Sequence, residues 1–115
     1  MLRLLVPLAF FISALPLAAA PAELSLQHRT LVRCSAAFAL VASGQENGDA
    51  EAQTFPPLEK RGRDFFIRAN ARVMEEAGLD RAGIEQALRA EASAIIVERS
   101  IGTVMQSCLP LLPRK

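Results

Sequence analysis

The chain has 115 residues and a formal net charge of +1 at neutral pH. This length corresponds to a single domain, and a charge so close to zero argues against a nucleic-acid-binding protein, which normally has a clear basic excess. A chain this short buries a limited share of its surface, so we expect it to need a covalent cross-link for stability.

Residues 1–22 have the pattern of an export signal. Arg3 supplies a positive charge, an apolar stretch covers 4–17, and Ala20-Pro21-Ala22 fits the small-residue cleavage pattern. The pattern predicts a signal peptide over 1–22, a mature domain over 23–115, and a periplasmic or secreted location.

The alternative for this segment is a retained membrane anchor. Residues 4–22 carry no charge over roughly the length that a bilayer requires. Three prolines interrupt the stretch and favour cleavage, after which no stable membrane insertion is expected: Pro7, Pro16 and Pro21.

Residues 24–43 have the spacing of an amphipathic helix. Apolar residues recur along one helical face, namely Leu24, Leu31, Cys34, Phe38 and Val41. Gly44 follows at a position where a left-handed cap favours a residue without a Cβ, so we expect the helix to end there.

The next segment, 45–54, is polar and acidic and contains Asn47-Gly48. Because it shows no apolar periodicity, the sequence predicts a flexible acidic loop.

A second helix is predicted over 57–77, starting at Pro56-Pro57, because the fixed φ of proline suits a first helical turn. Gly62 lies in its apolar stripe, so we expect a neighbouring helix to approach closely there. Gly78 follows as a predicted cap. The stripe comprises Leu58, Gly62, Phe65, Phe66, Ala69, Val73 and Ala77.

A third helix is predicted over 80–98. Asp80 is a good N-cap, and Leu79 with Ile84 has the spacing of a hydrophobic staple.

A fourth segment, 101–109, also has helical spacing. Ser100 and Gly102 favour a break before it, although one continuous helix is an alternative that the pattern leaves open. No segment alternates long enough to be a strand. The predicted fold is therefore all-α, a compact three- or four-helix bundle closed by one disulfide.

The predicted disulfide joins Cys34 and Cys108, the two cysteines of the chain. Disulfides persist in exported proteins, and both cysteines lie on apolar faces of predicted helices. A redox-active pair is the alternative, but that chemistry usually uses an accessible cysteine in a closely spaced motif. We expect a structural bridge that joins the first helix to the last.

No catalytic pattern is recognisable. His28 is the one histidine, near the start of the first helix, and we expect it to be a surface residue. No nucleophile, phosphate-loop or dinucleotide motif occurs, and two cysteines with one histidine do not fill a closed zinc site. The sequence predicts no enzyme, no cofactor and no metal.

Arginines cluster on the second helix, where Arg61, Arg68 and Arg72 lie along one stripe. Such guanidinium groups can bind phosphate, a carboxylate or anionic lipid, so they are candidate contacts for an anion or a partner. The alternative is a solvated face with two local ion pairs, Glu59 with Arg63 and Asp64 with Arg68.

Phe65 and Phe66 are adjacent, so both cannot lie at the centre of one buried stripe. We expect one to be partly exposed, and Phe66 is the candidate partner contact.

Three stretches resemble an uncharacterised family of small exported bacterial two-cysteine helical proteins: Arg33-Cys34-Ser35-Ala36-Ala37-Phe38, Arg61-Gly62-Arg63-Asp64-Phe65-Phe66 and Cys108-Leu109-Pro110-Leu111-Leu112. That family has no assigned activity to transfer. In size, compartment and its two cysteines the chain is also similar to the periplasmic acid-stress chaperones.

Two functional hypotheses follow. The first is a non-catalytic periplasmic helical module that binds a protein or an envelope component. The second is a pH-conditional chaperone that exposes apolar faces when its carboxylates are protonated.

Overall fold

The computed structural model describes residues 23–114 and contains four helices in that range: α1 (Leu26–Glu46), α2 (Glu59–Ala77), α3 (Arg81–Glu98) and α4 (Ile101–Cys108). Short 3-10 turns follow α1 and α4, over Ala52–Thr54 and Leu109–Leu111. No strand occurs in this range. The all-α bundle is confirmed, whereas the predicted signal peptide and the alternative anchor lie outside the described residues.

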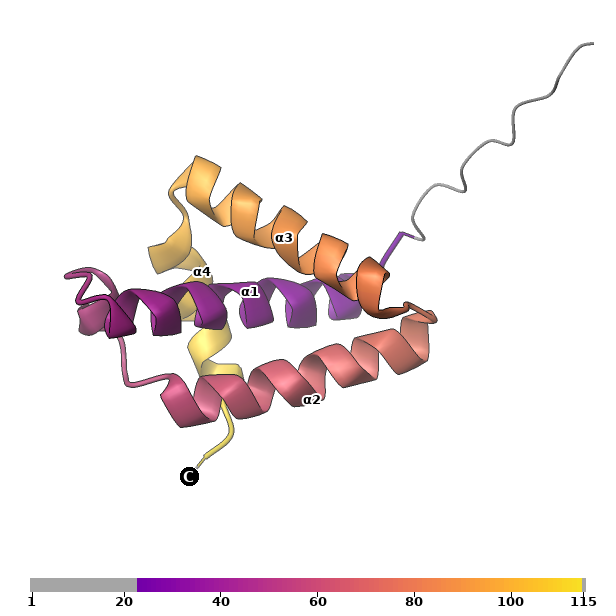
Figure 1. Ribbon diagram of the computed structural model, residues 1–115, viewed down its shortest axis with the longest axis horizontal. Coiled ribbons are helices and arrows are strands. Elements are labelled where there is room, and N and C mark those ends of the chain that lie inside the picture. Colours follow the sequence, from indigo (N-terminus) through magenta and orange to yellow (C-terminus); the bar gives the residue numbers. More distant parts are fainter. Residues whose placement is uncertain (1–22, 115) are drawn as a thin grey trace, which may run out of the picture.

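Helix α1 is the central element. It packs against each of the other three helices, and Figure 1 shows it between α2 and α3, with α4 crossing at its side. A helix with neighbours on several sides needs small or apolar residues around most of its circumference. The buried residues of α1 meet this need: Val32, Cys34, Ser35, Ala36, Ala37, Phe38 and Val41.

The predicted disulfide is present in the bundle. Cys34 of α1 and Cys108 of α4 are joined across a sequence separation of 74 residues, with 5.3 Å between their Cα atoms. The two residues are only 2% and 1% exposed, and they belong to the main apolar cluster with Phe38, Ile95 and Met105. The bridge therefore fastens the last helix to the first inside the core.

A second, smaller apolar cluster lies apart from the disulfide. Its buried members are Val32 of α1, Val73 of α2 and Ile84 of α3. The cluster is where α1 meets the C-terminal half of α2 and the N-terminal half of α3. Leu24 and Leu79, which lie outside the helices, also pack on this cluster.

Several helix ends follow the predicted local chemistry. The Asp80 side chain accepts a hydrogen bond from the Gly83 N–H at 2.8 Å, which confirms it as the N-cap of α3. Gly78 has a φ of 67° and caps α2, as predicted. Arg99 also has a left-handed backbone, with a φ of 52°. The chain turns there, so α3 and α4 are separate helices.

The predicted end of the first helix at Gly44 is wrong. Helix α1 continues to Glu46, and the left-handed glycine is Gly48, with a φ of 73°. A Cβ on Gly44 would lie 2.7 Å from the Cβ of Ala52, closer than such atoms approach. The glycine is therefore explained by the return of the chain over the helix.

The second helix begins at Glu59, two residues later than predicted from Pro56-Pro57. Its predicted stripe faces the bundle, with Leu58, Gly62, Ala69 and Val73 buried. A Cβ on Gly62 would lie 3.6 Å from the Cβ of Phe38 and 3.2 Å from that of Leu58. The expected close approach of a neighbouring helix at Gly62 is confirmed, and that helix is α1.

Candidate functional site

A groove lies between the C-terminal half of α1 and the N-terminal half of α2, and it is larger than two other hollows of about 340 and 240 Å³ on the described part of the chain. It has a volume of about 730 Å³, within the usual size range of binding sites. No residue of α3 or α4 lines it. The lining is Phe38, Ala39, Ala42, Ser43, Gln45 and Glu46 of α1, Gln53, Phe55, Pro57 and Leu58 of the connection, and Glu59, Gly62, Arg63 and Phe66 of α2.

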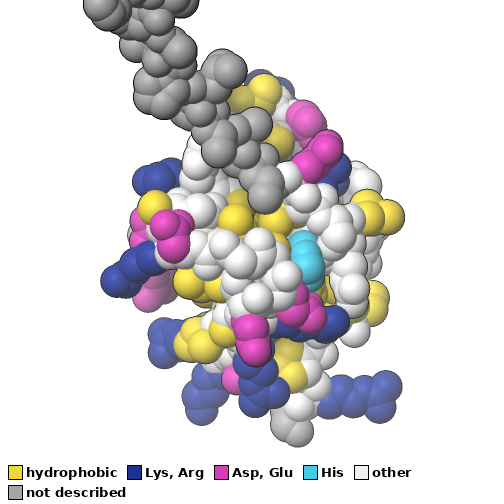
Figure 2. Space-filling view, turned by 90° about the vertical axis from the view of Figure 1, so that its right-hand side faces the viewer, with side chains coloured by type: hydrophobic (Ala, Val, Ile, Leu, Met, Phe, Trp, Pro, Cys, Tyr) yellow, Lys and Arg dark blue, Asp and Glu magenta, His cyan; other side chains and the backbone are white. Residues whose placement is uncertain are grey.

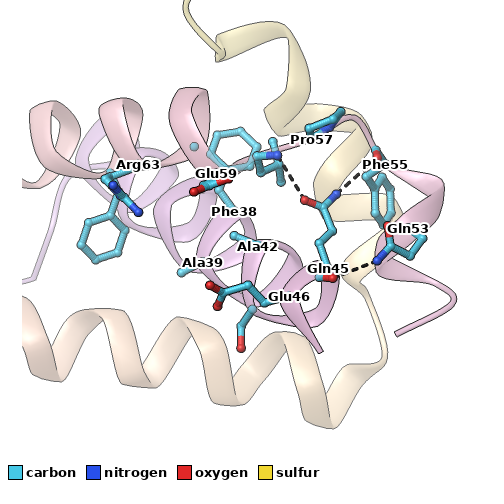
Figure 3. Close-up of a pocket in the computed structure, with 14 residues that line it drawn as sticks. Phe38, Ala39, Ala42, Gln45, Glu46, Gln53, Phe55, Pro57, Glu59 and Arg63 are labelled. Carbon is cyan, nitrogen blue, oxygen red and sulfur yellow. Dashed lines mark hydrogen bonds between the residues drawn. The ribbon is translucent and has the colours of Figure 1, made fainter. Parts of the chain in front are cut away.

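The floor of the groove is formed by small residues. Ala39, Ala42 and Ser43 lie on one face of α1, and Gly62 lies opposite them on α2. Figure 3 shows Ala39 and Ala42 between Glu59 and Arg63 on the α2 side and Glu46 on the other side. The groove is therefore hollow along its centre because Ala39, Ala42 and Ser43 lack large side chains.

The end wall of the groove is the segment that the sequence analysis interpreted as a flexible loop and the start of α2. The Gln45 side-chain amide lies 3.0, 3.2 and 2.9 Å from the carbonyl oxygens of Ala52, Phe55 and Pro56. Its Oε1 accepts a hydrogen bond from the Leu58 N–H at 3.1 Å. Figure 3 draws the bond from Gln45 to Phe55.

This network also accounts for the start of α2. The N-cap position, Leu58, has no side chain that can accept a hydrogen bond, and its own buried N–H needs an acceptor. Gln45 supplies that acceptor from the end of α1. The prediction of a flexible acidic loop over 45–54 did not include this network. Its hydrogen bonds join Gln45, at the start of that segment, to residues near and beyond the end of the segment.

Three charged side chains line the groove without an ion pair. Among residues 23–114, no ion pair includes Glu46, Glu59 or Arg63. The predicted pair of Glu59 with Arg63 is therefore wrong. The groove offers two carboxylates and one guanidinium group beside an apolar floor.

The predicted arginine contacts, by contrast, each have a partner within the protein. Arg68 and Arg72 form ion pairs one helical turn along α2, and Arg61 binds the C-terminal segment. Arg68 Nε lies 3.2 Å from Oδ1 of Asp64, which confirms that predicted pair. Arg72 Nε lies 2.9 Å from Oε1 of Glu76, and Arg61 Nε donates a hydrogen bond to the Pro113 carbonyl oxygen at 2.9 Å. Anion binding by these three arginines stays a prediction.

The two adjacent phenylalanines differ in their surroundings. The Phe65 ring packs edge-to-face on that of Phe38, with 5.1 Å between ring centroids. Phe66 is half-buried and lines the groove. The structure thus places the predicted contact residue Phe66 at the groove.

His28 lies at the opposite end of α1, in a polar cluster. Its Nε2 is 3.1 Å from Oε1 of Glu76, which Arg72 also contacts. The hydrogen bond from His28 and then that from Arg72 lower the pKa of Glu76 from its ordinary value of 4.5. Figure 2 shows the histidine, in cyan, beside acidic and basic side chains. The expectation that His28 is a surface residue is only partly met, because its side chain is 15% exposed and contacts Glu76 of another helix, which the sequence did not predict.

No metal-binding cluster of three or more His, Cys, Asp or Glu side chains occurs within the described range. No helix in that range is long and apolar enough to cross a membrane.

Most of the groove is not predictable from the sequence. Its residues come from three segments, one of which was interpreted as a linker. Two signals were present, the small residues Ala39 and Ala42 spaced three apart, and the aromatic Phe55 at the end of a polar stretch. Neither indicates a groove until the packing of α1 on α2 is known.

Comparisons with protein-family models, curated proteins and solved structures gave no match to this chain.

Proposed function

We propose that the protein is an exported, non-catalytic helical module that binds a protein or an envelope component through the α1–α2 groove. The observation that supports this most directly is the combination of an apolar floor with three charged side chains that have no internal ion pair. Exposed charges beside apolar surface are typical of the rim of a binding site. The buried disulfide supports an oxidising compartment, such as the periplasm or the exterior of the cell.

Site-specific photo-crosslinking tests this proposal. A photoreactive residue replaces Ala39 at the groove, and Ala90, an exposed alanine of α3 that does not line the groove, serves as the matched control. The full chain is expressed in cells that export it. We expect one defined adduct from position 39 and none from position 90. No adduct, or the same adducts from both positions, would contradict the proposal.

A pH-conditional chaperone is the second candidate, and a specific observation favours it. Glu76 joins α2 to α1 through His28, and Glu91 joins α3 to α1 through Arg33 at 3.0 Å. Protonation of these carboxylates would weaken both connections around the smaller apolar cluster. Dye binding by 8-anilinonaphthalene-1-sulfonate, titrated from neutral pH to about 2, tests exposure of apolar surface. A client-aggregation assay at the same pH values tests chaperone activity, and a negative result in both assays would remove this candidate.

A further inference from the structure

The groove has the dimensions of a helix-binding site. The lining positions on α1 extend from Phe38 to Glu46, which at 1.5 Å per residue is about 12 Å, or roughly two helical turns. Helices α1 and α2 both line the groove, and they run antiparallel to each other (Figure 1). A third helix laid along two such helices, as in a helix bundle, buries their shared face.

The floor favours an occupant with large apolar side chains. Packing between helices inserts a side chain of one helix into the space between residues of another. Ala39 and Ala42 leave such spaces open, while Phe55 and Phe66 lie beside them in the lining. A partner helix therefore needs bulky residues at intervals of three and four.

The charges favour a basic occupant. Glu46 and Glu59 outnumber Arg63 in the lining, and none of the three is neutralised by an ion pair in residues 23–114. A lysine or arginine on the partner would gain a favourable interaction there, and a carboxylate would be repelled. The same charges disfavour a fatty acid or an anionic lipid headgroup.

We propose that the groove binds a short amphipathic helix of a partner protein, about two to three turns long, with bulky apolar residues on one face and lysine or arginine beside them. This inference rests on the proposed binding role of the groove and names the chemical class of the partner. The mode of recognition is a helix in a groove, in which a few apolar anchors provide most of the affinity.

A peptide-display selection tests the inference without knowledge of the partner. The probe is a library of random 16-residue peptides (~16 residues cover the groove with flanking turns), selected on the exported, purified protein. We expect enriched peptides to carry bulky apolar residues at helical spacing and an excess of lysine and arginine, and to become helical on binding.

Variants connect that binding to the groove. Ala39→Arg should lower the affinity of the selected peptides for the protein by roughly tenfold or more. Ala90→Arg, the matched change on α3, should leave that affinity unchanged. The double variant Glu46→Gln/Glu59→Gln should weaken binding roughly three- to tenfold at low ionic strength, and by less at high salt.

Four results would overturn the inference. The enriched peptides could lack helical spacing or basic residues, or their binding could be insensitive to Ala39→Arg. Oleate could bind in the groove while no peptide is enriched, which would indicate a lipid. Light scattering could show a dimer that Ala39→Arg abolishes, again without peptide enrichment, which would indicate a second copy. If position 39 still cross-links to one protein in cells, the proposed function stands although this inference fails.

Discussion

His28 and Glu76 lie 48 residues apart in sequence, yet the Nε2 of one is 3.1 Å from the Oε1 of the other. An ionised carboxylate only accepts hydrogen bonds, so His28 Nε2 is the donor. The contact joins the first turn of α1 to the last turn of α2. It lies beside the smaller apolar cluster, which has no disulfide of its own.

This contact predicts an acid-sensitive contribution to stability. The pKa of Glu76 is lower in the folded protein than its ordinary value of 4.5. A lowered pKa stabilises the fold above about 4.5, and this stabilisation is lost as the pH falls through the folded-state pKa. Glu76→Gln should therefore lower the Tm at pH 7, with a smaller difference from the unmodified protein at pH 3.

Glu75→Gln is the control for that prediction. Glu75 is the adjacent exposed carboxylate, and it forms no ion pair in residues 23–114. Equal losses of Tm in the two variants, or a loss in Glu76→Gln that does not change with pH, would contradict the assignment. Circular dichroism melts at both pH values measure the effect.

The buried disulfide should be a large part of the stability of the domain. It closes a loop with a sequence separation of 74 residues, for which the chain-entropy relation gives about 4 kcal/mol. We expect Cys34→Ser/Cys108→Ser to unfold at a much lower urea concentration than the oxidised protein. If reduced and carboxymethylated protein melts at the same temperature as the oxidised form, the bridge has no structural role.

Gln45 should stabilise the start of α2 and the end wall of the groove. Gln45→Ala leaves the buried Leu58 N–H without its acceptor, a loss that typically costs about 1 to 3 kcal/mol. Gln86→Ala, at an exposed position of α3, should cost little. Urea unfolding measures both variants, and hydrogen exchange at the Leu58 amide should accelerate in Gln45→Ala alone. Similar free energies of unfolding for the two variants would argue against this role.

Two glycine substitutions should have opposite effects. Gly102 lies in α4 with no atom within 4 Å of an added Cβ, so Gly102→Ala should stabilise the protein by about 0.5 kcal/mol through helix propensity. Gly44→Ala has the same propensity gain, but its Cβ would meet that of Ala52 at 2.7 Å. We expect a net loss of stability. A rise in Tm for both variants would contradict this prediction, because it would show that the segment with Ala52 moves away from α1 at little cost.

Much of the secondary structure was predictable because its causes are local. Apolar spacing, the Asp80 cap and the Gly78 turn each act within a few residues, and they place α2 and α3 close to the observed bounds. Gly44 was misinterpreted for the same reason. A glycine at the end of an apolar stripe indicates a cap, whereas the contact with Ala52 that explains it comes from a segment that returns over the helix.

Local patterns along the chain are therefore enough to predict an all-α fold, the order of its helices and two cysteines placed to join the first helix to the last. The other features depend on how the helices pack. The groove, the Gln45 network and the His28–Glu76 contact each require residues from different elements to meet, and their positions depend on how the helices pack. Helical periodicity predicts which face of a helix is buried, but it does not specify which side chain of another helix will lie against that face.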